Sequence, residues 1–159
     1  MSAEKVEREI LIEAPPEVVW GVLTEPEQIG RWFSDEAELE QRAGTDGTLT
    51  WRPGGRGGSA SGMTLTIRVV EAEPHRRFCF RWGHPEGATA DEDNSALVEF
   101  LLTEEPAGTR LRVIESGIDA LAGDADGRAR YREDHERGWE RHLRELHDHV
   151  AATAPGGAS

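Results

Sequence analysis

One apolar stripe near the end of the sequence constrains the fold more than any other feature. Its residues recur at steps of three or four: Tyr131, His135, Trp139, Leu143, Leu146 and Val150. This spacing predicts one long amphipathic helix of roughly 24 residues, about 36 Å at 1.5 Å per residue. The opposite face carries Arg, Glu and Asp. A helix of this kind must bury its stripe against another element of the chain.

The rest of the chain supplies strands for that purpose. Apolar and polar residues alternate with a period of two, which is typical of half-buried strands. Short turns separate most of the alternating segments, and this predicts an antiparallel meander. The segments are residues 6–13, 37–42, 48–52, 63–69, 77–82, 98–102 and 111–115.

Two short helices are expected after the first strand. Pro16 and Pro26 each suit the first turn of a helix, where a missing backbone N–H costs nothing. Apolar residues follow the prolines at helical spacing: Val19, Val22 and Leu23 after the first, and Ile29, Trp32 and Phe33 after the second. The predicted order is strand, two short helices, about six strands and one long helix. We therefore expect an α+β fold, in which an antiparallel sheet of about six to seven strands wraps around the C-terminal helix.

The length and the charge of the chain limit its expected domain number, its partners and its location. A chain of 159 residues suits a single domain, expected over residues 1–151, with a disordered tail over residues 152–159. The net charge of −13 repels phosphate backbones, so no nucleic-acid partner is expected. No apolar stretch is long enough to span a membrane. The single cysteine, Cys79, allows no internal disulfide, so a reducing cytoplasm is the expected location.

Four motifs of the sequence, in this order, resemble those of a known family. They are Ile12 to Trp20 continuing to Trp32-Phe33, Val69 to Phe78 closing on Phe80 to Gly83, Gly108 to Leu111 followed by Gly117, and Gly138-Trp139 with Leu143. Over about residues 5–151 the chain resembles the helix-grip START-like superfamily (SRPBCC). Within that superfamily it is similar to the bacterial homologues of the C-terminal domain of the heat-shock-protein-90 ATPase activator.

The resemblance implies a helix-grip fold with a cavity for a hydrophobic or amphipathic ligand. The first hypothesis is that the protein binds a small hydrophobic or aromatic ligand between the curved sheet and the C-terminal helix. Stress response, resistance, and lipid or polyketide metabolism are the settings that the superfamily suggests. One alternative is a cyclase- or hydrolase-like enzyme that uses Glu115 or His135. Another is a protein-interaction module of the co-chaperone kind. The protein is expected to be a monomer or a homodimer.

Aromatic residues are the main candidates for the wall of the cavity, because large flat side chains suit a flat or greasy ligand. Core packing is the alternative for each of them. Strand parity alone does not say which face of the sheet points inward. The candidate ligand-binding residues are Trp32, Phe33, Trp51, Met63, Phe80, Trp82, Phe100, Val113, Glu115, Tyr131, His135 and Trp139.

Glu115 is the most informative ionisable residue. It shares the parity of Leu111 and Val113, so it points into the cavity if they do. Burial there would raise the pKa of the carboxyl group and make it an acid, a base or a ligand anchor. At a wet strand end it would instead be solvated or paired with an Arg. Together with Tyr131 and His135 it could form the polar end of a pocket.

No metal or cofactor is predicted. Of the six histidines, four lie on the last helix, but none shows the spacing of four residues that a helical zinc pair requires. His142 and His147 are five residues apart and therefore lie about 140° apart around the helix. The glycine-rich segment over residues 53–62 lacks the lysine and the following helix of a phosphate-binding loop.

Overall fold

The computed structural model describes residues 5–54, 62–82, 90–91, 94–118, 121 and 124–153. Within these residues the chain forms strands and helices in the following order: β1 (Val6–Ile12), α1 (Pro16–Thr24), α2 (Pro26–Trp32), β2 (Glu36–Glu38), β3 (Asp46–Trp51), β4 (Met63–Glu73), β5 (Arg77–Trp82), β6 (Ala96–Glu105), β7 (Gly108–Ser116) and α3 (Ala125–Thr153).

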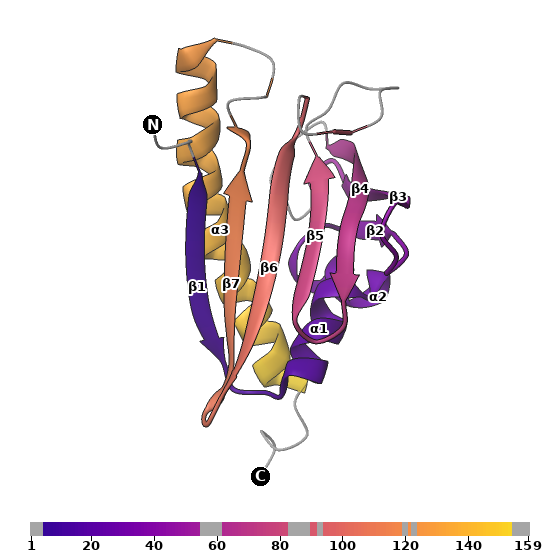
Figure 1. Ribbon diagram of the computed structural model, residues 1–159, viewed down its shortest axis with the longest axis vertical. Coiled ribbons are helices and arrows are strands. Elements are labelled where there is room, and N and C mark those ends of the chain that lie inside the picture. Colours follow the sequence, from indigo (N-terminus) through magenta and orange to yellow (C-terminus); the bar gives the residue numbers. More distant parts are fainter. Residues whose placement is uncertain are drawn as a thin grey trace.

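All seven strands belong to one antiparallel sheet with the order β1-β7-β6-β5-β4-β3-β2. From β2 to β7 each strand pairs with its neighbour in the sequence, which is the predicted meander. The first strand closes the sheet by pairing with the last, with Val6 opposite Glu115 and Ile12 opposite Thr109. The long helix α3 runs behind the sheet, and α1 and α2 lie beside its lower half (Figure 1). The predicted α+β helix-grip fold is confirmed.

The two short helices begin where the prolines predict. Pro16 and Pro26 each occupy the first turn of a helix. Glu17 and Glu27 lie in the same first turns, where the positive end of the helix dipole favours a carboxylate. The apolar residues that follow point into the core, so that α1 and α2 cover the part of the sheet that α3 leaves open.

The prediction of a strand over residues 37–42 is wrong from Leu39 onward, because β2 ends at Glu38. The pairing of β2 with β3 places Glu38 opposite Thr48. In that register Arg42 would face Gly44, and a single residue would be left for the turn. A hairpin needs at least two residues there. The chain therefore leaves the sheet after Glu38 and makes a wider loop before β3.

The core lies between the sheet and the three helices. Along β7, Leu111, Val113 and Glu115 are buried, which answers the question of parity: this set of side chains faces α3. The same alternation buries one face of β6. From α3 the buried side chains are those of the predicted stripe, with Tyr131 and His135 only partly covered. The buried part of the stripe consists of Trp139, Leu143, Leu146 and Val150.

Some predictions concern the ends and loops of the chain. The helix α3 continues to Thr153, two residues into the segment that was expected to be a tail. The rest of that segment, residues 154–159, lies outside the described residues. So do residues 55–61, which make up most of the glycine-rich segment, and residues 83–89 and 92–93 between β5 and β6.

Two glycines with opposite surroundings test this packing. Gly108 begins β7 at a φ of 148°, and a Cβ there would lie 2.1 Å from the carbonyl oxygen of Ile12. We expect Gly108→Ala to lower the free energy of unfolding by about 2–3 kcal/mol, because the alanine must displace the end of β1. Chemical denaturation followed by circular dichroism measures this change.

Gly138→Ala is the matched control for this substitution. Gly138 lies inside α3, and a Cβ there would meet no neighbouring atom within 4 Å in the described part of the chain. Alanine should therefore raise the free energy of unfolding by about 0.5–1 kcal/mol, through its higher helix propensity. Equal effects of the two substitutions would contradict the assigned packing.

Candidate functional site

The site is built around the side chain of Glu115, near the C-terminal end of β7. This residue is flanked in the sheet by Val6 on β1 and Val98 on β6. Its inward parity turns the carboxylate toward α3, and its exposed fraction is 0%. A carboxylate is rarely found fully buried unless its charge is compensated. The hydrogen-bond partners of Glu115 therefore determine its charge and its chemical role.

Four donors converge on this carboxylate. Its Oε1 atom accepts hydrogen bonds from Nε1 of Trp139 at 2.8 Å and from Nδ1 of His135 at 2.7 Å. Its Oε2 atom accepts from Nε1 of Trp82 at 2.8 Å and from the hydroxyl of Tyr131. An ionised carboxylate has about four lone-pair positions, so each is used. Glu115 therefore acts as an organiser of other side chains.

Three of the four donors come from one face of α3. Tyr131, His135 and Trp139 follow one another at intervals of four residues, which places them in a row along the helix. The rings of Tyr131 and His135 stack on each other, with centroids 3.8 Å apart and an angle of 20°. The fourth donor, Trp82, is the last residue of β5. The carboxylate thus joins β5, β7 and α3 at one point.

The balance of burial and hydrogen bonding decides the charge of Glu115. Burial raises the pKa of its carboxyl group, but the hydrogen bond of His135 and, when the imidazole is protonated, its positive charge outweigh burial together with the hydrogen bonds of Tyr131 and Trp139, and they leave the pKa below its ordinary value. The raised pKa that burial alone predicts is therefore wrong, and the carboxylate is ionised near neutral pH. Burial and the neighbouring carboxylate raise the pKa of Tyr131, which keeps the phenol protonated and able to donate.

The ionised carboxylate also fixes the tautomer of His135. A carboxylate without a proton can only accept, so the Nδ1 atom that faces it must carry the hydrogen. In the neutral imidazole the lone pair then lies on Nε2. About 28% of the His135 side chain is exposed, in contrast to the carboxylate that holds it.

An aromatic cluster, formed by Trp32, Phe33, Trp51, Trp82 and Trp139, adjoins these hydrogen bonds. The ring of Phe33 stacks on Trp139 at 5.4 Å and on Trp32 at 5.1 Å. Trp51 meets Phe33 edge-on at 5.4 Å, and Trp82 stacks on Trp139 at 5.8 Å. Each ring of the cluster belongs to a residue that is at most 7% exposed. The rings therefore fill the space between them with their own atoms.

A comparison with known protein families shows to which family this chain belongs. The profile described as Activator of Hsp90 ATPase homolog 1-like protein matches residues 13–151. The chain belongs to this AHSA1-like family. The matched segment includes Glu115 and the four side chains that donate to it. Among curated proteins, none matches the chain.

Solved structures share the fold of this AHSA1-like chain. A protein from Mesorhizobium loti is 23% identical with a TM-score of 0.74, and the match covers 94% of this chain and 98% of that one. A protein from Rhodobacter sphaeroides is 25% identical with a TM-score of 0.73, covering 95% of each chain. The Aha1 protein from Colwellia psychrerythraea, whose solution structure is described as a dimer, is 19% identical with a TM-score of 0.65, covering 91% and 94%.

Most of the candidate residues of this AHSA1-like chain meet in one region. The aromatic cluster and the three polar candidates are connected directly, and Phe80 and Phe100 join them through ring contacts with Trp82 and Trp139 at 5.3 and 5.7 Å. Val113 is buried opposite Phe100 on the neighbouring strand. Met63 lies at the edge of this group, because it pairs with Trp51 of β3 while 51% of its surface is exposed.

One residue at this region was not among the candidates. His142 lies edge-on to the ring of Phe33 at 4.8 Å and contacts Trp32 and Trp139 as well. From the sequence, His142 stands out only as a potential metal ligand. Its position three residues after Trp139 and seven after His135 was the available signal, because this spacing places it beside both on one side of the helix.

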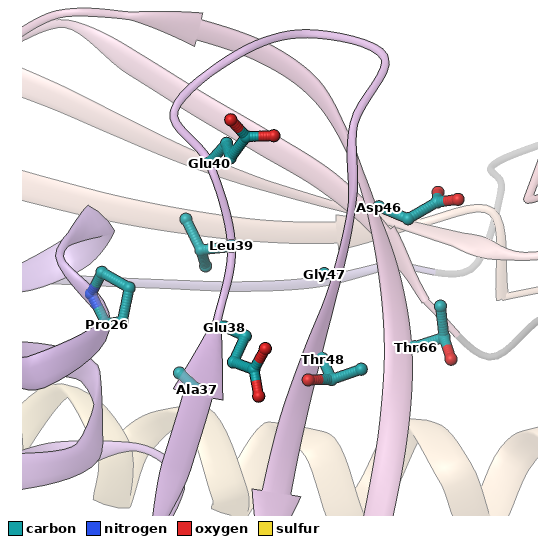
Figure 2. A pocket seen from close by; sticks show the side chains of 9 residues that line it. All are labelled: Pro26, Ala37, Glu38, Leu39, Glu40, Asp46, Gly47, Thr48 and Thr66. Carbon is teal, nitrogen blue, oxygen red and sulfur yellow. The ribbon is translucent and has the colours of Figure 1, made fainter.

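A separate pocket of about 520 Å³ lies at the wider loop between β2 and β3. Figure 2 shows that Leu39 and Pro26 approach each other on one side, while Glu38, Thr48 and Thr66 lie along neighbouring strands. None of the candidate ligand-binding residues lines it. Its lining consists of Pro26, Ala37, Glu38, Leu39, Glu40, Asp46, Gly47, Thr48 and Thr66.

Metal-ligand clusters and membrane-spanning helices were both sought among the described residues. In the parts of the chain that the structure covers, no three His, Cys, Asp or Glu side chains come together as a metal site would require. Among the same residues, no helix combines the length and the apolar character that crossing a membrane demands.

Removing the charge of Glu115 tests its role as organiser. We expect Glu115→Gln to lower the free energy of unfolding by about 3 kcal/mol, since the new NH₂ group would face donors instead of accepting from them. Urea denaturation measures the change. Glu104→Gln, at an exposed position of β6, is the matched control and should stay within about 0.5 kcal/mol of the wild type. Similar free energies of unfolding for the two variants would contradict the role of Glu115 as organiser.

The lowered pKa of Glu115 predicts a loss of stability in acid. Its contribution is fully present above the pKa of the unfolded chain, about 4.3. The contribution is lost as the pH falls through the still lower pKa of the folded state, because the unfolded chain then binds the proton first. Unfolding free energies between pH 7 and pH 3 should therefore fall more for the wild type than for Glu115→Gln. Parallel pH profiles would contradict this assignment.

Proposed function

We propose that this AHSA1-like chain binds a small hydrophobic or aromatic ligand between the curved sheet and α3, at the aromatic cluster. The observation that carries the proposal is the fully buried carboxylate of Glu115 with its four donors. Taking a carboxylate out of water costs several kcal/mol, and apolar side chains of similar volume often stabilise a core as well or better. A buried charge beside stacked rings therefore favours a site that orients a ligand.

The chemistry of the cluster indicates the class of ligand. Indole and phenyl rings bind by burying apolar surface, at about 25 cal/mol per Å², and by stacking on flat partners. Because the rings of the cluster contact one another, a ligand must enter beside them or move them apart. The half-exposed side chains of Tyr131 and His135 mark the end of α3 at which we propose that it enters. We place this activity in the cytoplasm, in a monomer or a homodimer.

The wider setting follows from the superfamily that the sequence resembles. We propose that the ligand belongs to a stress response, to resistance, or to lipid or polyketide metabolism. The ligand itself is to be identified by its binding to the purified protein.

A second candidate function is acid–base catalysis of the cyclase or hydrolase type. The observation that favours it is the 2.7 Å contact between Oε1 of Glu115 and Nδ1 of His135. A carboxylate that holds one nitrogen of an imidazole leaves the other nitrogen to take or give a proton. In this reading His135 is the acid–base group, and Glu115 positions it. Turnover that is lost in His135→Phe would support this function over simple binding.

A fluorescent hydrophobic probe tests the binding function. N-phenyl-1-naphthylamine becomes brighter when it leaves water, and we expect the wild type to bind it with saturation. Trp139→Phe should weaken binding about three- to tenfold, because the substitution removes ring area and a donor to Glu115. Titration of the probe at fixed protein concentration measures the dissociation constant.

Trp20→Phe is the matched control for that experiment. Trp20 is as buried as Trp82, but it packs against Phe78 and donates to Gln41, away from Glu115. Its substitution should change the dissociation constant less than twofold. Equal weakening by both variants, or no binding by the wild type, would overturn the proposed function.

A further inference from the structure

The imidazole of His135 is held on three sides. Nδ1 donates to Glu115, one ring face stacks on Tyr131, and Trp82 meets the ring edge-on at 5.8 Å. Nε2 lies on the edge of the ring remote from Nδ1, and in the described part of the chain no group bonds to it. His135 therefore presents one hydrogen-bonding atom of fixed direction beside the aromatic cluster.

Open space lies on the surface of α3 at Gly138, close to the position of His135 along the helix. Gly138 follows His135 by three residues, which places the two positions side by side on the helix surface. A Cβ at Gly138 would have no neighbour within 4 Å among the described residues. A glycine inside a helix costs about 1 kcal/mol relative to alanine. The chain thus leaves room where a larger side chain would stabilise the helix.

We propose that the ligand is an aromatic compound with an acidic hydroxyl group, a phenol or an enol, that bonds to Nε2 of His135 while its ring lies over Gly138. This inference rests on the proposed binding function and names the class of ligand for it. The hydroxyl proton is shared between the ligand oxygen and Nε2. If it moves to Nε2, the products are an oxyanion and an imidazolium that the Glu115 carboxylate stabilises, and no further reactant is needed.

Other polar groups fit this position less well. An ammonium group brings three donors, and the single lone pair of Nε2 can satisfy only one of them. A carboxylate brings no proton and finds no donor on a neutral His135. An ether or a plain aromatic ring leaves Nε2 without a partner. A hydroxyl has one proton for the one lone pair, and an acidic hydroxyl keeps its hydrogen bond wherever the proton rests.

Two probes of one shape test the inference. Isothermal titration calorimetry compares 1-naphthol with 1-methoxynaphthalene, which has the same rings but no hydroxyl proton. We expect the wild type to bind 1-naphthol at least tenfold more tightly. In His135→Phe, which keeps a ring to stack on Tyr131 but has no acceptor, the ratio should fall to about one. His147→Phe changes a more exposed histidine of the same helix and should leave the ratio unchanged.

Gly138→Leu keeps the inference testable if His135→Phe does not fold. Leucine is a strong helix former, and the space at this position is open, so the variant should fold at least as well as the wild type. Its side chain should reduce the binding of 1-naphthol at least tenfold. Unfolding curves for each variant separate this loss from a loss of structure.

The outcomes separate this inference from the proposed function. Equal affinity of the wild type for the two naphthalenes, or a ratio that survives in His135→Phe, would overturn the inference. So would undiminished binding of 1-naphthol to Gly138→Leu. If N-phenyl-1-naphthylamine still binds in those cases, the proposed function stands and only the class of ligand is wrong. If none of the three probes binds to the wild type, both proposals fail.

Discussion

The inner structure of this protein depends on the hydrogen bonds that the buried carboxylate of Glu115 accepts. This residue accepts hydrogen bonds from α3 and from β5 while its own backbone lies in β7. Hydrophobic packing has no preferred direction, so it would hold α3 against the sheet in many similar arrangements. Four directed hydrogen bonds to one buried charge select one of them, and they fix the rotation of α3 about its axis.

The same interaction sets the properties of its neighbours. Trp82 and Trp139 each donate their single N–H group to the carboxylate, so their ring faces remain available for apolar contacts. Tyr131 stays protonated because burial and the neighbouring negative charge both raise the pKa of its phenol. His135 is oriented and given a defined tautomer. One buried group thus determines which surfaces of four side chains are available to a ligand.

Much of this arrangement could be predicted from the sequence. The spacing of Tyr131, His135 and Trp139 predicts their common face on the helix, and alternation along β7 places Glu115 with Leu111 and Val113. Which parity faces inward could not be predicted, because both faces of β7 carry side chains of mixed character. The pKa of Glu115 was also out of reach, since its direction depends on donors from two other elements. The early end of β2 could not be predicted, because residues 43–47 leave room for a hairpin turn, and only the observed register, with Glu38 opposite Thr48, excludes a longer strand.

The pairing of the first strand with the last has a consequence for how the chain folds. Val6 lies opposite Glu115, so β1 can find its partner only after more than a hundred further residues have been synthesised. Contacts between residues so distant in sequence require a large loop to close and are formed slowly. Until then β1 is an unpaired strand with exposed edges, which invites contact with other chains. The residues of α3 that complete the bonds to Glu115 leave the ribosome later still. The core and the candidate site must therefore form together, near the end of folding.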